Sequence, residues 1–244
     1  MPKALRYFHA GQHYHLTHRC HNRSFLFRFA KDRDTYREMM RERIGQFRTP
    51  LLAYCITSNH VHLLVTARSP TRISELMESL QGDFAQHYNL RKKRTGAFWG
   101  GRFHAVAVEG GEYVLNCMNY IELKMVRAGV VNHPADWKWC SYGELMGLRQ
   151  RYRSVDREHL GDVIGRHPDT EAFMDDYRHG IEQRIQADEL ARESIWTEPL
   201  AVGSRSFIEK ISGDVRNRRQ LEVAHTDHAP TETWMLRESR APYA

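Results

Sequence analysis

The central hydrophobic pattern of the chain is a pair of apolar runs that flank a short polar turn, Leu51 to Thr66 with the sequence LLAYCITSNHVHLLVT. Each apolar run predicts a strand, and Thr57-Ser58-Asn59 predicts the turn between them. Side chains alternate between the two faces of a strand, so His60 and His62 at the start of the second run project to the same side. The two imidazoles are then close enough to bind one cation.

The remaining periodicity predicts two more strands and three helices around this hairpin. Apolar residues recur every three or four positions in the helical segments and alternate with polar residues in the strands. The predicted strands are 11–19, 51–56, 60–66 and 102–109, and the predicted helices are 32–47, 71–89 and 112–128. This order predicts an α+β fold, a ferredoxin-like antiparallel sheet with helices packed on it.

The last third of the chain is more polar than the rest. We therefore predict one domain over residues 1–150 and a mostly helical, acidic C-terminal extension over residues 151–244. From Pro230 onward the pattern predicts a loosely held end. Helical periodicity within the extension covers two segments, 171–185 and 206–219.

The distribution of charge along the chain indicates the kind of partner that the protein binds. Residues 1–150 carry a net charge of +10 and residues 151–244 a net charge of −4, for a total of +6. A basic first domain predicts a polyanionic partner, with nucleic acid as the leading candidate. The alternative is a basic surface that is only solvated.

Composition restricts the class of protein. A hydrophobic content of 41% is sufficient for a packed core. No apolar stretch is long enough to span a bilayer and no N-terminal targeting pattern is present, so we expect no membrane partner and a cytoplasmic, nucleoid-associated protein. Four widely spaced cysteines predict free thiols rather than a disulfide framework or a zinc ribbon.

The histidine pair by itself is weak support for a metal site. The chain contains 15 histidines, and a second His-x-His occurs at His13 and His15. A histidine on a strand is more often a partly buried polar residue than a ligand. We interpret His13, His15 and His18 as structural or DNA-contacting rather than metal-binding.

A basic run followed by aromatic residues and glycines predicts a loop near residue 95. Its candidate DNA-contacting side chains are Arg91, Lys92, Lys93, Arg94, Phe98, Trp99 and Arg102. In one interpretation the cations hold phosphates while an aromatic ring stacks on an unpaired base. In the other, the loop is a solvated basic turn and Phe98 and Trp99 belong to the core.

Four motifs in order, SNHVHLLV, GAFWGGRF, YIELKMVRAGVV and DWKWCSY, resemble the REP-associated tyrosine transposases of the single-tyrosine HUH superfamily. The resemblance covers about residues 11–142. It includes the aromatic segment Pro134 to Tyr142, which we expect to dock on the core. In this family two histidines hold a divalent ion and a tyrosine attacks a DNA phosphate.

The resemblance implies roles for individual residues. It assigns His60 and His62 as ligands of Mg²⁺ or Mn²⁺ and Tyr120 as the nucleophile that forms a 5′-phosphotyrosine link to single-stranded or hairpin DNA. A phenol, with a pKa near 10, is a poor nucleophile until a Lewis acid polarises the phosphate. Arg127 is expected to pack at a helix end or to touch phosphate. The enzyme is expected to be a monomer or a homodimer.

One position departs from the family pattern. Relatives usually carry Asn or Gln four residues after the tyrosine, often followed by Pro, where this chain has Lys124 and Met125. An ammonium group cannot ligate a cation. Three interpretations remain: Asn116 on the same helical face supplies the oxygen, water fills the position, or Lys124 neutralises the DNA phosphate in a metal-poor site. We favour weakened but present catalysis.

Three functions follow from these residues. The first is a metal-dependent DNA strand-transferase that acts through Tyr120. The second is a domesticated protein that binds DNA hairpins without cleaving them, for which Lys124 is the supporting feature. The third is an unrelated nuclease that uses a water activated at His60 and His62. A local cluster of Arg216, Arg218 and Arg219 leaves a second DNA contact open.

Overall fold

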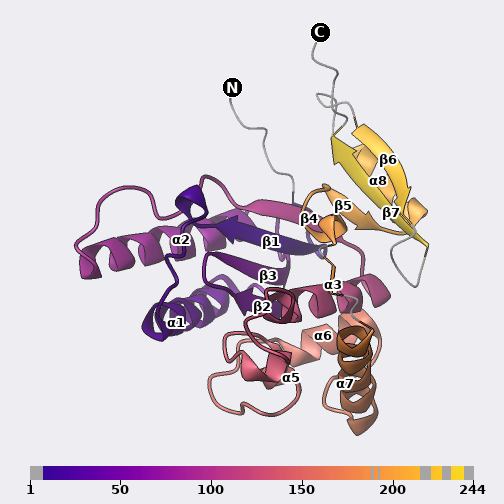
Figure 1. Ribbon diagram of the computed structural model, residues 1–244. Coiled ribbons are helices and arrows are strands. Elements are labelled where there is room, and N and C mark those ends of the chain that lie inside the picture. Colours follow the sequence, from indigo (N-terminus) through magenta and orange to yellow (C-terminus); the bar gives the residue numbers. More distant parts are fainter. Residues whose placement is uncertain (1–7, 188–189, 192, 215–220, 227–231, 239–244) are drawn as a thin grey trace.

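The computed structural model describes residues 8–187, 190–191, 193–214, 221–226 and 232–238. The strands of this part of the chain form a sheet of seven in the order β2-β3-β1-β4-β5-β7-β6 (Figure 1). The first four are β1 (His13–Arg19), β2 (Leu51–Ile56), β3 (His60–Thr66) and β4 (His104–Val108), and they pair antiparallel.

Helices α1 (Ala30–Phe47), α2 (Arg72–Arg91) and α3 (Glu112–Glu122) complete the predicted ferredoxin-like order. The α+β prediction is confirmed, and the predicted ends of the first two helices are correct to within one or two residues. The end of α1 follows from its sequence, because Arg48 takes a left-handed conformation just ahead of Thr49-Pro50.

The third predicted helix is interrupted at Leu123. Its ψ of 2° lies outside the helical range, so α3 ends at Glu122 and a short helix, α4 (Lys124–Arg127), follows. The prediction of one continuous helix from residue 112 to 128 is therefore corrected. Gly129 does terminate the segment, with a φ of +63°.

The C-terminal extension is mostly helical but also contributes strands. Its helices are α6 (Arg157–Ile164), α7 (Glu171–Gln186) and α8 (Arg205–Asp214), and its strands are β5 (Ala201–Gly203), β6 (Leu221–Thr226) and β7 (Thr233–Glu238); the short α5 (Tyr142–Leu145) precedes it, at the end of the first domain. The sequence pattern did not predict these strands. Strand β5 pairs parallel to β4, so the extension continues the sheet of the first domain.

Two predictions for the extension fall partly outside the described residues. The helical segment expected at 206–219 is α8 as far as Asp214, and the Arg216, Arg218 and Arg219 cluster lies beyond the described part. Residues 233–238, expected in a loosely held end, form β7 and pair with both β5 and β6. Main-chain hydrogen bonding to two neighbours therefore orders this segment.

Short 3-10 helices link the larger elements. They are η1 (His21–Arg23), η2 (Pro134–Asp136) and η3 (Ser194–Trp196). The aromatic segment that contains η2 docks on the core as predicted: the Trp137 indole donates to the Ile56 carbonyl at 3.0 Å, and Cys140 pairs with Cys55 through a β-bridge. This segment covers the outer side of β2.

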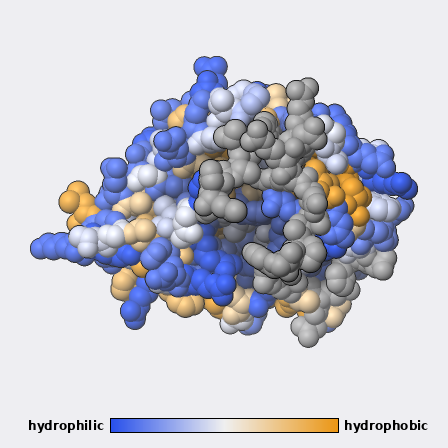
Figure 2. Space-filling model, turned by 90° about the horizontal axis from the view of Figure 1, so that it is seen from above, coloured by the Kyte–Doolittle hydropathy of each residue, from blue (hydrophilic) through white to orange (hydrophobic). Residues whose placement is uncertain are grey.

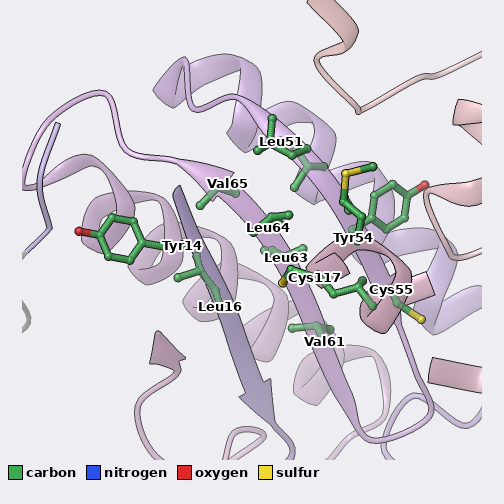
Figure 3. Packing of buried hydrophobic residues seen from close by; sticks show 14 of the residues in the cluster. Tyr14, Leu16, Leu51, Tyr54, Cys55, Val61, Leu63, Leu64, Val65 and Cys117 are labelled. Carbon is green, nitrogen blue, oxygen red and sulfur yellow. The ribbon is translucent and has the colours of Figure 1, made fainter. Parts of the chain in front are cut away.

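Strand register determines which side chains share the face that carries the site. On β1 and β3, Thr17 lies opposite His62 and Arg19 opposite His60, so these side chains project to one face. The alternate residues are apolar except for His18 on β1, and Figure 3 shows Leu16, Leu63 and other members of that core. The polar side of the sheet is thus built on a fully buried aliphatic layer.

Hydrophilic residues dominate the face seen in Figure 2, and hydrophobic ones form small separate patches. Among the described helices, none combines the length and the hydropathy that crossing a bilayer requires. The four cysteines are free and buried.

A buried carboxyl group connects α3 to the C-terminal extension. The two Glu122 oxygens accept hydrogen bonds from the Ser141 hydroxyl at 2.5 Å and the Tyr177 hydroxyl at 2.9 Å. Burial raises the pKa of Glu122 from 4.5 to about 7, although both hydrogen bonds oppose the shift. Between about pH 4.5 and pH 7, the folded protein therefore keeps a proton on Glu122 that the unfolded chain has released.

This carboxyl group makes folding stability depend on pH. Because the folded-state pKa is the higher one, its contribution is complete below about pH 4.5 and is lost as the pH rises through 7, a change on the order of 3 kcal/mol. We expect Glu122→Gln to remove that loss, measured as the difference in urea-unfolding free energy between pH 5 and pH 8. The exposed Glu112→Gln on the same helix is the control. Parallel pH profiles for wild type and Glu122→Gln would contradict the assignment.

Candidate active site

Two neighbouring imidazoles at the start of β3 form the centre of the site. The ring centroids of His60 and His62 are 4.7 Å apart and the rings are inclined by 72°. Burial lowers the pKa of His60 to about 3, with Lys124 and Arg19 adding to the effect, and lowers the pKa of His62 well below 6.5. Both rings are therefore neutral at neutral pH, the form in which imidazole binds metal ions.

The turn before β3 fixes the orientation of His60. Its Nδ1 lies 2.6 Å from Asn59 Oδ1 and 2.9 Å from Thr57 Oγ1. The Asn59 amide donates to the Arg23 carbonyl and the Thr57 hydroxyl donates to the His60 carbonyl, so both oxygens are left as acceptors. Nδ1 therefore carries the proton, and Nε2 keeps its lone pair.

A third histidine stands behind the pair. His15 on β1 is fully buried, with Nε2 2.9 Å from His62 Nδ1 and Nδ1 2.7 Å from the Trp196 carbonyl. Burial lowers the pKa of His15 to about 3. The two other histidines of this strand make separate contacts: His13 bonds Thr66, and His18 bonds the Gly101 carbonyl.

Tyr120 on α3 lies against these imidazoles. Its side chain is buried, with ring centroids 5.9 Å from His15 and 6.1 Å from His62. The Arg127 guanidinium lies 4.2 Å from the centre of the phenol ring and donates to the Tyr120 carbonyl. The structure therefore brings the predicted nucleophile and the predicted metal ligands together within one chain.

These side chains line a pocket of about 220 Å³ with a positive rim. Arg19, Arg102 and Lys124 line it together with His60, His62 and Tyr120, and no carboxylate of the described residues does so. The Lys124 ammonium lies 5.4 Å from the Tyr120 ring centroid. Three fixed cations around neutral imidazoles favour an anion such as a DNA phosphate.

The two histidines fit a divalent ion. The Nε2 atoms of His60 and His62 are buried, and within the described part of the chain neither has a hydrogen-bond partner. Two imidazole nitrogens leave the remaining coordination positions to phosphate and water oxygens. No described group of three His, Cys, Asp or Glu residues forms a closed metal site. The donor set thus suits an ion that is shared with the substrate.

Asn116 is not brought to this site. Its Oδ1 accepts a hydrogen bond from Arg184 of α7 at 3.0 Å, and the side chain is not part of the pocket lining. The proposal of Asn116 as a third ligand is therefore corrected, because the C-terminal extension engages its oxygen. Of the three interpretations of the missing ligand, water and Lys124 remain.

The aromatic part of the 95–103 loop belongs to the core. Phe98 is 2% exposed and packs edge-to-face against Phe84 and Tyr88, so no base can stack on it. Trp99 stacks on His18 at 4.3 Å, and its indole donates to the Gln81 carbonyl. The DNA-stacking prediction is wrong for Phe98, and the structure gives Trp99 a packing role.

The basic residues before this loop differ in their contacts. Arg91 forms an ion pair with the buried Asp32 at the start of α1, which commits it to the fold. Arg94 donates to Asn89 near the end of α2 and to the Ala97 carbonyl in its own loop. Lys92 lies 4.3 Å from the Phe29 ring centroid, and Lys93 is exposed. Lys92 and Lys93 are thus better placed than Arg91 for DNA contact.

Several site residues were missed at the sequence level. Arg19 follows from the alternation of HYHLTHR, which places it on the same face as His15 and Thr17. Asn59 was assigned only to a turn, although an amide directly before a candidate ligand is a possible orienting group. Nothing in the sequence pattern marked Trp196, since it contributes a main-chain oxygen.

Comparison with known proteins identifies relatives of the first domain. The chain matches the IS200-like transposase family over residues 9–124. A solved REP-associated tyrosine transposase bound to a REP hairpin matches with a TM-score of 0.52 and 18% identity, covering 64% of this chain and 93% of that chain. A candidate transposase from Deinococcus radiodurans has a TM-score of 0.35 and 18% identity, covering 45% of this chain and 85% of that chain.

No curated protein gives a significant match. The first structural likeness establishes a shared fold, and the family match covers β1 to Lys124, the segment that supplies His60, His62 and Tyr120. Residues 9–124 of this chain therefore match the IS200-like transposase family and share the fold of a REP-associated tyrosine transposase, in agreement with the resemblance predicted from the motifs.

Proposed function

We propose that this protein cleaves and rejoins single-stranded or hairpin DNA through a covalent 5′-phosphotyrosine intermediate on Tyr120, with Mg²⁺ or Mn²⁺ held by His60 and His62. One observation carries the proposal: the Tyr120 ring lies 6.1 Å from the His62 ring in a pocket lined by cations. Nucleophile, ligands and phosphate-binding charges all come from the same chain.

The chemistry of the step follows from these groups. The Tyr120 oxygen forms a bond to phosphorus while the bond between phosphorus and the 3′ oxygen breaks. The phenol releases its proton to solvent, and the leaving 3′ oxygen takes up a proton from solvent. Arg127, 4.2 Å from the ring centroid, and Lys124 place positive charge beside the Tyr120 ring, where negative charge develops during the attack. A bound divalent ion supplies polarisation of the phosphate. Attack by a 3′-OH on the phosphotyrosine reverses the step without ATP.

The surroundings support DNA as the substrate. Arg19, Arg102 and Lys124 place positive charge where a scissile phosphate would lie. The solved relative with the same fold is bound to a REP hairpin, which supports a hairpin with unpaired flanks as the substrate class. Binding to phosphates implies that affinity falls steeply with added salt.

The test is formation of a covalent adduct. A 5′- or 3′-labelled hairpin with single-stranded flanks is incubated with the full chain and Mg²⁺ or Mn²⁺, then resolved on a denaturing gel. We expect a labelled species that carries the protein mass and a released strand ending in 3′-OH. Absence of an adduct across a panel of flank sequences and both metals would remove the catalytic proposal.

A second candidate function is DNA-hairpin binding without cleavage. The observation that favours it is Lys124, whose ammonium lies in the pocket beside His60 and His62 and lowers the pKa of both. The same charge opposes binding of a cation. Under this function the wild-type chain retains hairpins in a salt-sensitive manner and forms no adduct.

Lys124→Asn separates the two functions. Removing the ammonium and adding an amide oxygen is expected to raise Mn²⁺ affinity about tenfold, since roughly 1.4 kcal/mol of repulsion is a modest value for a charge this close. Titration calorimetry measures the affinity, and adduct formation at limiting Mn²⁺ measures the consequence. Lys124→Met removes the charge without adding an oxygen and is the matched control.

If the wild-type chain forms adducts that Lys124→Asn accelerates, Lys124 only weakens catalysis. Adducts formed by Lys124→Asn alone would identify the wild type as a binding protein. Equal Mn²⁺ affinity in wild type and both variants would show that Lys124 does not affect the metal site.

A further inference from the structure

A chain of hydrogen bonds runs from the C-terminal extension to His62. The Trp196 carbonyl oxygen lies 2.7 Å from His15 Nδ1, and His15 Nε2 lies 2.9 Å from His62 Nδ1. The His15 and His62 rings are nearly parallel, with centroids 5.1 Å apart and an inclination of 16°. Trp196 lies outside the segment that matches the transposase family.

The position of each proton in this chain is set by the first acceptor. A carbonyl oxygen only accepts, so His15 Nδ1 carries the proton that it donates to Trp196. His15 is fully buried, and none of the carboxylates of the described residues bonds its ring, so a charged imidazolium would be costly there. His15 Nε2 is then an acceptor, and His62 Nδ1 must be the donor. His62 Nε2 is left with a free lone pair.

We propose that His15 is a positioning residue: anchored by the Trp196 carbonyl, it holds His62 in the tautomer whose Nε2 lone pair is available to a metal ion. The inference rests on the proposed function for its consequence in metal binding, but the tautomer itself exists without metal. Hydrogen bonding of a ligand histidine through its second nitrogen orients the ring and increases its basicity.

The residue whose carbonyl begins this series of hydrogen bonds, Trp196, is held in place by its own contacts. Trp196 is 2% exposed, and its indole donates to Glu193 Oε2 at 2.8 Å. A few residues later, the Leu200 carbonyl accepts from Ala107 on β4, where β5 joins the sheet. Pairing of β5 with β4 thus places the Trp196 carbonyl next to His15, so the C-terminal extension contributes a hydrogen-bond acceptor beside the site.

The two metal-facing histidines are therefore oriented by different means. His60 donates to Asn59 and Thr57 in its own turn, a local arrangement. His62 depends on His15 and, through it, on a residue 181 positions from His15 in the chain. Thr17 Oγ1, at 3.5 Å from His62 Nδ1, is a poor substitute for His15 as the acceptor.

The test uses the full chain labelled with ¹⁵N-histidine and free of metal. Long-range ¹H–¹⁵N spectra identify the protonated nitrogen of each neutral imidazole. We expect His62 and His15 both to be protonated at Nδ1. A wild-type spectrum that shows the proton on His62 Nε2 overturns the inference without any variant being made.

His15→Phe removes the acceptor and keeps a ring of similar size. We expect His62 to lose its single tautomer in this variant and Mn²⁺ affinity to fall about 10- to 100-fold. His15→Gln offers an amide oxygen to His62 and is expected to restore most of the single His62 tautomer and most of the Mn²⁺ affinity. If His15→Phe folds and leaves tautomer and affinity unchanged, the inference is overturned. If it does not fold, the wild-type spectrum and His15→Gln decide.

The outcome is separable from the proposed function. A wild-type chain that binds no Mn²⁺ would remove the metal-dependent function, whereas the tautomer of His62 would still decide whether His15 positions it. Conversely, Mn²⁺ binding together with an Nε2-protonated His62 would retain the function and remove the role of His15.

Discussion

Tyr120→Phe is expected to abolish the covalent protein–DNA adduct and to reduce strand cleavage by roughly four orders of magnitude or more, since it removes the proposed nucleophilic oxygen. The change deletes one oxygen from a buried ring that packs between His15, His62 and Arg127. Folding and hairpin affinity are therefore expected to remain close to wild type. Denaturing gels measure the adduct, and filter binding measures the affinity.

Tyr113→Phe on the same helix is the matched control for this experiment. The Tyr113 hydroxyl donates to the Glu232 carbonyl, and the side chain is half-buried, away from the lining of the pocket. It should leave the adduct unchanged. Cleavage that survives in Tyr120→Phe, with products that carry no protein, would instead identify a nuclease that uses water activated at His60 and His62.

Substitution of either histidine of the proposed metal site is expected to have the second-largest effect. We expect His60→Ala and His62→Ala each to lower Mn²⁺ affinity by about 100-fold or more, since changes to groups that only orient a ligand already cost 10- to 100-fold. Adduct formation should be lost at limiting Mn²⁺ and partly recovered at high Mn²⁺. Titration calorimetry and the dependence of adduct yield on Mn²⁺ measure the two effects.

His87→Ala provides the control, because His87 is an exposed histidine on α2. Its substitution should alter neither affinity nor adduct yield. Equal Mn²⁺ affinity in His87→Ala, His60→Ala and His62→Ala would show that the pair on β3 is not the metal site. Loss of affinity in only one of the two would indicate that the ion is held by a single imidazole.

The buried Glu122 adds a structural requirement to the site. It lies two residues after Tyr120 and bonds Ser141 and Tyr177, so the tyrosine helix is held by the aromatic segment and by α7 together. Arg184 of α7 also bonds Asn116 on the same helix. The position of Tyr120 therefore depends on residues beyond the segment matched by the family.

Local pattern was sufficient for the main elements of the first domain. The alternation around SNHVHLLV places His60 and His62 on one face, and helical spacing places Tyr120 on a helix after the last strand of the ferredoxin-like order. These properties follow from the two-residue repeat of a strand and the repeat of about 3.6 residues of a helix, both of which depend only on residues close together in the sequence. They were predicted correctly for that reason.

Other features depended on distant contacts and were not readable locally. From the sequence, Phe98 was equally suited to solvent and to the core, and the structure shows it packed against Phe84 of α2. The sequence also allowed Asn116 as a metal ligand, but in the structure its oxygen bonds Arg184. The strands β5, β6 and β7 are short or bordered by polar residues. Strand β5 depends on pairing with the distant β4 and joins β7 to the sheet, whereas β6 pairs with the neighbouring β7.

The sequence by itself therefore determined the identity of the reactive groups, the faces on which they lie and the charge around them. The tertiary structure alone decided that Tyr120 meets the imidazoles and that His15 takes its proton arrangement from Trp196. The reason is physical: side-chain periodicity is a local property, whereas a hydrogen bond between residues 181 positions apart forms only when the chain has folded and β5 has paired with β4.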